Sequence, residues 1–155
     1  MKIKDVMTKD VVRVSASLGI REIYKIFCEK HIGGVPVTDK SGRLLGMVTK
    51  TELLDVLIPD YFDMVGDFLF IDDFGALEEK LESVPTLELF IAEDLMMTNV
   101  ISIKEDASLM KAPVLMTKYN IRRLPVLDRD SKVVGVITRM DVCKALFNSG
   151  RAKPQ

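Results

Sequence analysis

The stretch GVITRMD at residues 135–141 leads from a short apolar run into a threonine, an arginine and an aspartate. The apolar run predicts a buried strand, and Asp141 follows Thr138 by three residues at the expected start of a helix. Nearly the same pattern occurs in GMVTKTE at residues 46–52. Because a hydroxyl and a carboxylate follow a buried strand at both places, we predict two copies of one structural unit.

The repeat extends well beyond these two stretches, because residues 3–58 align with residues 92–147 without a gap. We predict one copy at residues 1–58, a connecting segment at 59–91, a second copy at 92–148 and a tail at 149–155. The identical pairs, many with special backbone or polar requirements, are Asp5/Asp94, Met7/Met96, Val11/Val100, Ile32/Ile121, Pro36/Pro125, Val37/Val126, Asp39/Asp128, Gly46/Gly135, Thr49/Thr138 and Leu57/Leu146.

Within a copy, the pattern predicts strand, helix, strand, strand, helix, which is an α+β unit. In the first copy, VVRV at residues 11–14 reads as a strand, and apolar residues at 20, 23, 24 and 27 have the spacing of an amphipathic helix. A hairpin and a helix at residues 50–57 follow. The two strands joined through the first helix should be parallel, and the hairpin strands antiparallel.

Pro113 interrupts this pattern in the second copy, at the position that Tyr24 occupies in the first. A proline inside a helix removes a backbone hydrogen bond unless the helix begins late or kinks. We therefore predict a distortion at residues 111–113.

The connecting segment at residues 59–91 resembles neither copy and carries five of the seven phenylalanines. We expect an ordered helical insert that packs on the protein's own core. The alternative is a subunit or partner contact, because an apolar surface of this density would otherwise be exposed.

Composition narrows the classes of function. The 22 basic residues balance the 23 acidic ones, so nothing favours nucleic acid or an anionic membrane as a partner. No signal-length or membrane-length apolar run occurs, so we expect a cytoplasmic protein. Cys28 and Cys143 lack metal or redox spacing and are expected to be buried reduced thiols. With His31 as the only histidine, we expect no catalytic site, no metal site and no obligatory cofactor.

The element order, the PV-D hairpin starts at Pro36 and Pro125, and the strand exit GVITRMD resemble the cystathionine-β-synthase (CBS) domain, present as a tandem pair. The resemblance implies that the two repeats pack through their sheets with pseudo-two-fold symmetry and leave two clefts for adenosine-containing ligands. It further implies a homodimer and a regulatory sensor of the stand-alone kind that associates with an unidentified effector protein.

The strand exit of the second copy suits a nucleotide. Thr138 and the first-turn amides of the following helix can donate to a phosphate, and Asp141 can accept from two ribose hydroxyls. By resemblance, Arg123 contacts the phosphates, with Arg122 and Arg139 as helpers. The resemblance places the purine in a slot formed by Thr8, Val12, Ile32 and Val136, with its edge read by main-chain atoms near Val12.

The matching cleft of the first copy is expected to be weaker or differently used. Gly34 stands where the second copy has Arg123, and Glu52 places its carboxylate one methylene further out than Asp141. The residues assigned to this weaker site are Met47, Thr49, Glu52, Thr98, Ile101 and Ile121.

Other interpretations of these residues remain open. The pairs Thr138/Asp141 and Thr49/Glu52 have the spacing of a helix capping box, and Arg122 and Arg123 can simply be solvated. The leading hypothesis is a module that senses AMP, ADP or ATP. The alternatives are a pair that binds S-adenosylmethionine and a dimerising protein-interaction scaffold without ligand.

Overall fold

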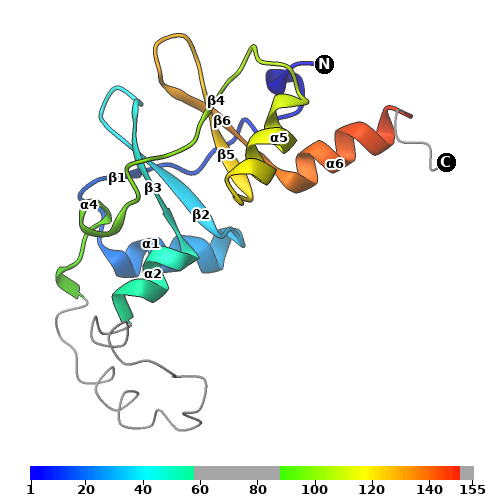
Figure 1. Ribbon diagram of the computed structural model, residues 1–155. Helices are drawn as coiled ribbons and strands as arrows, with labels where there is room; N and C mark the ends of the chain where they lie inside the picture. Colours follow the sequence, from blue (N-terminus) through cyan, green and yellow to red (C-terminus); the bar gives the residue numbers. More distant parts are fainter. Residues whose placement is uncertain (58–87, 151–155) are drawn as a thin grey trace, which may run out of the picture. The chain divides into compact units, whose positions relative to one another are not determined.

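The computed structural model describes residues 1–57 and 88–150, and the order β-α-β-β-α occurs twice in it (Figure 1). The predicted fold class is confirmed, whereas most of the predicted insert at 59–91 and the end of the tail lie outside the described residues. The elements are η1 (Ile3–Asp5), β1 (Val14–Ser15), α1 (Ile20–Lys30), β2 (Gly34–Thr38), β3 (Leu44–Thr49), α2 (Lys50–Leu57), α4 (Ala92–Leu95), β4 (Ile103–Lys104), α5 (Lys111–Lys118), β5 (Arg123–Leu127), β6 (Val133–Thr138) and α6 (Arg139–Asn148).

Each repeat forms a three-stranded sheet, with strand order β1-β2-β3 in the first and β4-β5-β6 in the second. In the second repeat β4 pairs with β5 in parallel, and β5 pairs with β6 antiparallel. Both predicted strand orientations are therefore confirmed there. The antiparallel register places Arg123 opposite Thr138 and Pro125 opposite Val136.

The described chain divides into two compact units that do not follow the repeats. The first unit combines Met1–Arg13 and Thr38–Leu45 with the chain from Asn99 onward, and the second combines Val14–Val37 with the described residues of Gly46–Thr98. The segment that leads into each repeat therefore packs with the other repeat. The repeat boundaries at 1–58 and 92–148, and the packing of the repeats through their sheets, stay predictions.

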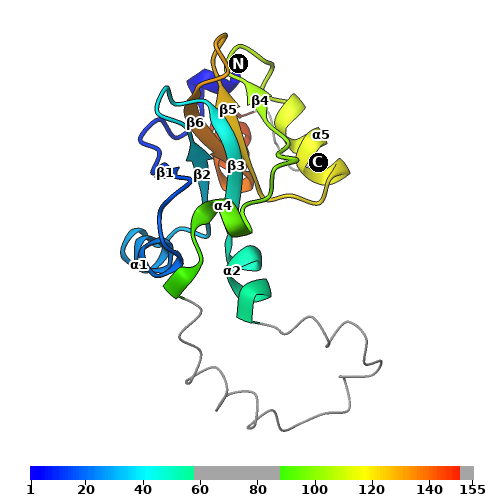
Figure 2. The ribbon, with the colours of Figure 1, turned by 90° about the vertical axis from the view of Figure 1, so that its left-hand side faces the viewer.

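The core of the first unit lies between the sheet of the second repeat and its helices. Helix α5 packs on β5, α6 packs on β6, and the two helices contact each other (Figures 1 and 2). Ile3 from η1 is fully buried in this core, so the N-terminal segment is part of it. The other buried members are Ile103, Leu109, Ala112, Met116, Leu124, Val126, Ile137 and Val142.

Two local predictions for the first repeat are confirmed only in part. The strand expected at residues 11–14 is Val14–Ser15, and the residues before Val14 belong to the other compact unit. In α1 the buried residues are Ile20, Ile23 and Phe27, whereas Tyr24 is 60% exposed. The buried stripe of α1 is thus narrower than the apolar spacing indicated.

The predicted distortion at Pro113 is a late helix start. Helix α5 begins at Lys111, two residues after the position that aligns with the first residue of α1. Pro113 therefore lies in the first turn, where a backbone N–H has no partner within the helix. The chain enters this turn through hydrogen bonds from the Lys111 N–H to the Ser108 C=O at 3.0 Å and from the Ala112 N–H to the Leu109 C=O at 3.1 Å.

The expectation of buried thiols is wrong. Cys28 on α1 and Cys143 on α6 are free, as expected, but both are exposed. Each follows a buried residue, Phe27 or Val142, by one position, which turns the side chain about 100° away from the core.

Candidate functional site

The corner where β5 begins and β6 ends brings two predicted residues together. Arg123 is the first residue of β5 and is paired with Thr138, the last residue of β6. Residues directly opposite in an antiparallel pair place their side chains on the same face of the sheet. Along β6 this face alternates with the buried one, and it carries the half-buried residues Val134, Val136 and Thr138.

Thr138 and Asp141 form a capping box at the start of α6, which confirms the capping interpretation. The Thr138 N–H and its hydroxyl both donate to Asp141 Oδ2, each at 2.8 Å, and the Asp141 N–H donates to Thr138 Oγ1 at 3.2 Å. The hydroxyl proton of Thr138 is therefore directed at the carboxylate of Asp141. Asp141 Oδ1 accepts no hydrogen bond from the residues that the structure describes.

This cap corrects the expectation that the helix start offers free donors to a phosphate. A helix begins with four N–H groups that lack intrahelical partners. Here the Thr138 and Asp141 N–H groups are used in the cap, and the Arg139 N–H donates to the Arg122 C=O at 3.2 Å. Among the described contacts only the Met140 N–H is left, so an anion here depends on side chains.

Three arginines surround this corner. Arg123 is half-buried, and its pKa is lowered from its ordinary value by burial first and by the nearby charge of Arg122 second. Arg122 and Arg139 are exposed, and Arg139 Nε donates to the Ile121 C=O at 3.2 Å. None of the three forms an ion pair with a described acidic residue. The corner therefore holds positive charge without a compensating carboxylate at salt-bridge distance.

The N-terminal segment supplies another predicted residue to the same strand. Thr8 and Val136 exchange both backbone hydrogen bonds, at 2.9 Å and 3.0 Å, so Thr8 lies beside β6. Since the N–H of Val136 is used by Thr8, it is not available as a donor to a ligand, whereas the side chain of Val136 is. Val12, four residues further on, has no backbone hydrogen bond within the described chain, so its N–H and C=O can read a purine edge. Ile32 belongs to the second unit, and its role as part of the slot stays a prediction.

The corresponding corner of the first repeat has a similar cap, although Thr49 Oγ1 accepts the N–H of Thr51, at 3.3 Å, where Thr138 Oγ1 accepts that of Asp141. The Thr49 N–H donates to Glu52 Oε2 at 2.7 Å and the Thr49 hydroxyl donates to the same oxygen. The longer glutamate side chain folds back onto the threonine, so the expectation that its carboxylate lies further out is wrong. Met47 pairs with Met97, and the neighbouring Thr98 is exposed. The other two residues of the weaker site, Ile101 and Ile121, belong to the first unit, whereas this corner belongs to the second.

The family of the chain follows from comparison with known proteins. The sequence matches the CBS domain twice, at residues 3–59 and 92–148. The chain belongs to the CBS domain family. Its solved relatives include CBSX2 in complex with AMP, which has a TM-score of 0.72 and 27% identity and covers 97% of this chain and 98% of that chain. The CBS domain pair of MJ0100, in complex with 5′-methylthioadenosine and S-adenosyl-L-methionine, has a TM-score of 0.70, 24% identity and coverages of 96% and 98%.

Among the relatives by sequence, MJ1426 of Methanocaldococcus jannaschii is 30% identical over 95% of this CBS chain and 92% of its own length. Other relatives are much longer. The L-aspartate semialdehyde sulfurtransferase of the same organism is 25% identical over 92% of this chain, which spans only 22% of that enzyme. CBS pairs thus also occur as parts of larger enzymes, and the absence of enzymatic activity here stays a prediction.

The structure adds two observations on partners and metals. None of the described helices is long and apolar enough to cross a membrane. Within residues 1–57 and 88–150, His, Cys, Asp and Glu side chains form no group of three placed to hold a metal ion.

Proposed function

We propose that this CBS pair is a regulatory ligand-sensing module that binds an adenine nucleotide, AMP, ADP or ATP, at the corner of β5, β6 and α6. The observation that carries the proposal is the half-buried Arg123, which faces Thr138 without an acidic partner among the described residues. A phosphate would supply the missing anion, and the planar guanidinium matches its geometry. Arg122 and Arg139 add exposed donors at the same corner.

The sugar and the base have separate partners in this proposal. Asp141 Oδ1 accepts hydrogen bonds from the two ribose hydroxyls, while Oδ2 keeps its hydrogen bonds within the cap. The side chains of Thr8 and Val136 contact the purine, and the main chain of Val12, which has no hydrogen bond within the described chain, reads its edge. The contribution of Ile32 rests on the family resemblance alone. Such a division lets one carboxylate serve the helix and the ligand at once.

CBSX2 supports the choice of ligand class, because its solved complex contains AMP and the two chains cover each other almost completely. The likeness to the pair of MJ0100 supports the fold alone. A ligand regulates only through a difference in affinity between two states, so sensing requires that occupancy of this corner favours one arrangement of the protein. The homodimer, the effector protein and the weaker first-repeat site are further parts of the proposal.

S-adenosylmethionine is the second candidate, and the capping geometry favours it. Three of the four N–H groups that lack intrahelical partners at the start of α6 already donate other hydrogen bonds, so the helix contributes little to phosphate binding. A site anchored by Asp141 and the purine slot needs only adenosine. The three arginines are the feature that favours a nucleotide over a sulfonium ligand, because a second positive charge would be repelled.

Calorimetric titration decides between these candidates. Protein shown by mass spectrometry to be free of copurified ligand is titrated with AMP, ADP, ATP, adenosine and S-adenosylmethionine. We expect AMP to bind about tenfold or more tightly than adenosine, since one charge-assisted phosphate contact supplies at least 1.4 kcal/mol. Equal affinity for AMP and adenosine would remove the arginines from the site, and no heat with any of the five would leave only the scaffold hypothesis.

A further inference from the structure

Met7 packs directly against the main chain of Gly135 in the middle of β6. A Cβ built on Gly135 would lie 2.9 Å from Met7 Cγ and 3.0 Å from the Thr8 C=O, and closer still to Met7 Sδ. Carbon atoms essentially never approach so closely, so no residue other than glycine fits without displacing the methionine. Gly135 thus forms a notch that accepts the Met7 side chain.

The first repeat has the same arrangement, which makes an accidental contact at Gly135 a poor explanation. A Cβ on Gly46 would lie 2.7 Å from Met96 Sδ and 2.8 Å from the Met97 C=O. In both repeats the residue after the methionine pairs with the residue after the glycine: Thr8 with Val136, and Met97 with Met47. The notch and the backbone pairing therefore act together to fix the register of the incoming segment on the strand.

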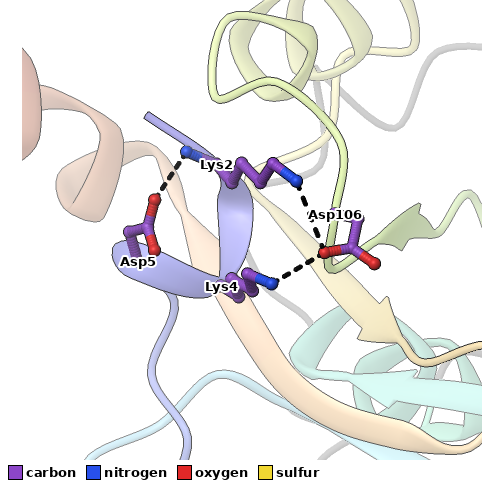
Figure 3. Close-up of polar contacts among 4 residues, drawn as sticks. All are labelled: Lys2, Lys4, Asp5 and Asp106. Carbon is purple, nitrogen blue, oxygen red and sulfur yellow. Dashed lines mark hydrogen bonds and ion pairs between the residues drawn. The ribbon is translucent and has the colours of Figure 1, made fainter.

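The rest of the N-terminal segment explains why this register matters. Before Met7, the segment is held by the buried Ile3, by the Ile3 and Lys4 N–H groups bonded to Ala107 and Glu105, and by the ion pair of Lys4 with Asp106 (Figure 3). After Thr8, no further backbone hydrogen bond joins residues 9–13 to the second repeat within the described chain. The Met7–Thr8 attachment is therefore the last one before Val12.

We propose that Met7, seated in the Gly135 notch, is a positioning residue for the nucleotide site, because it sets where Thr8 lies along β6 and thereby where the chain leaves the strand on its way to Val12. This inference rests on the proposed function for its effect on affinity. Its structural part does not, because the register of Thr8 on Val136 is measurable without ligand. Met7 itself touches no ligand; it acts through Thr8 and Val12.

Hydrogen exchange of the Thr8 and Val136 amides tests the notch in the full chain without nucleotide. Gly135→Ala should expel Met7 and speed both amides by about tenfold or more. Met7→Ala in the same chain removes the clash with the methionine, but it also removes the side chain that fills the notch and leaves the Thr8 C=O at 3.0 Å from the new methyl group, so the double variant should recover no more protection than Met7→Ala alone retains. Gly46→Ala is the matched control, because it should speed Met47 and Met97 instead. Unchanged exchange in Gly135→Ala, or equal loss in both glycine variants at Thr8, overturns the inference.

Titration with AMP tests the effect on affinity. We expect about tenfold weaker binding in Gly135→Ala, and in the double variant an affinity no higher than that of Met7→Ala alone. Met7→Ala alone, which cannot clash, should weaken binding by a few-fold and serves if Gly135→Ala fails to fold. Gly19→Ala, whose methyl group meets nothing within 4 Å, is the neutral control. Faster exchange with unchanged AMP affinity overturns the positioning role. If the unmodified protein binds no adenosine ligand, the proposed function and the positioning role fail together, whereas exchange still decides whether the notch sets the register.

Discussion

Arg123 lies directly across the β5–β6 pair from Thr138, half-buried, beside a second arginine and without a carboxylate at salt-bridge distance in the described chain. Burial lowers the pKa of its guanidinium, which means that folding disfavours the charge. The aligned residue of the first repeat is Gly34, so the fold itself does not require an arginine here. The charge is better explained by a ligand than by stability.

Replacing Arg123 separates these two roles. Arg123→Leu should weaken AMP binding by about tenfold or more and leave adenosine binding unchanged, because only the phosphate loses its partner. Thermal stability should stay equal or rise, since an unpaired half-buried charge is removed. Calorimetry and thermal melts check both, with Arg129→Leu, an exposed arginine, as control. An equal loss for AMP and adenosine would contradict the phosphate role.

Asp141 carries a structural and a proposed binding role that two substitutions can separate. Asp141→Ala should lower the free energy of unfolding by about 1 kcal/mol, because the cap at Thr138 is lost. Glu52→Ala removes the same bonds from Thr49 and should cost a similar amount. Asp141→Asn keeps an acceptor for the cap and should preserve stability while weakening AMP binding. Urea unfolding and calorimetry measure the two effects, and AMP affinity unchanged in both Asp141 variants would exclude the carboxylate from the site.

The ion pair of Lys4 and Asp106 should make stability depend on pH. The hydrogen bond from Lys4, and then its charge, lower the pKa of Asp106, while Asp106 raises the pKa of Lys4 (Figure 3). Because its pKa is lowered, the Asp106 carboxylate stabilises the folded state at pH values above the ordinary carboxyl pKa of about 3.9, and this contribution disappears as the pH falls through the lowered pKa. The contribution of Lys4 to stability is present at pH values below the ordinary lysine pKa of about 10.4 and disappears as the pH rises through the raised pKa.

Asp106→Asn should therefore melt at a lower temperature than the original protein at neutral pH, by a small margin because both groups are exposed. The margin should vanish in acid and shrink in about 1 M salt. Asp130→Asn, which removes an exposed carboxylate without a described ion pair, should show no such pH dependence. Identical pH profiles for the two variants would show that the Lys4–Asp106 contact contributes nothing.

Pro113 should be nearly neutral for stability despite lying in a helix. Its missing N–H falls in the first turn of α5, so Pro113→Ala should change the free energy of unfolding by less than about 1 kcal/mol. Val114→Pro, one residue later at a 62% exposed position, should cost about 3 kcal/mol or more because it removes an intrahelical hydrogen bond. Urea unfolding measures both, and equal costs would place the helix start elsewhere.

The sequence repeat proved informative wherever an identical residue satisfies a nearby backbone group. Asp5 and Asp94 each accept the N–H three residues earlier, at 2.8 Å and 2.9 Å, and the hydroxyls of Thr49 and Thr138 accept first-turn N–H groups of their helices. Such interactions span a few residues, so spacing reveals them. The apolar run before Thr138 predicted β6 in the same way. Tyr24 shows the limit, because its spacing fits the buried face of α1 although its side chain is exposed.

The amino-acid sequence by itself determined the two repeats, the order of their elements and a distortion at residues 111–113, because these depend on contacts along a short stretch of chain. It left open whether Pro113 delays or kinks its helix and whether Thr49 and Thr138 cap theirs. Only the tertiary structure decided that Met1–Arg13 packs with the second repeat, that Met7 enters the notch at Gly135 and that Arg123 meets no described acid. Those relationships join residues more than a hundred positions apart or depend on what is missing nearby, and no local spacing encodes either.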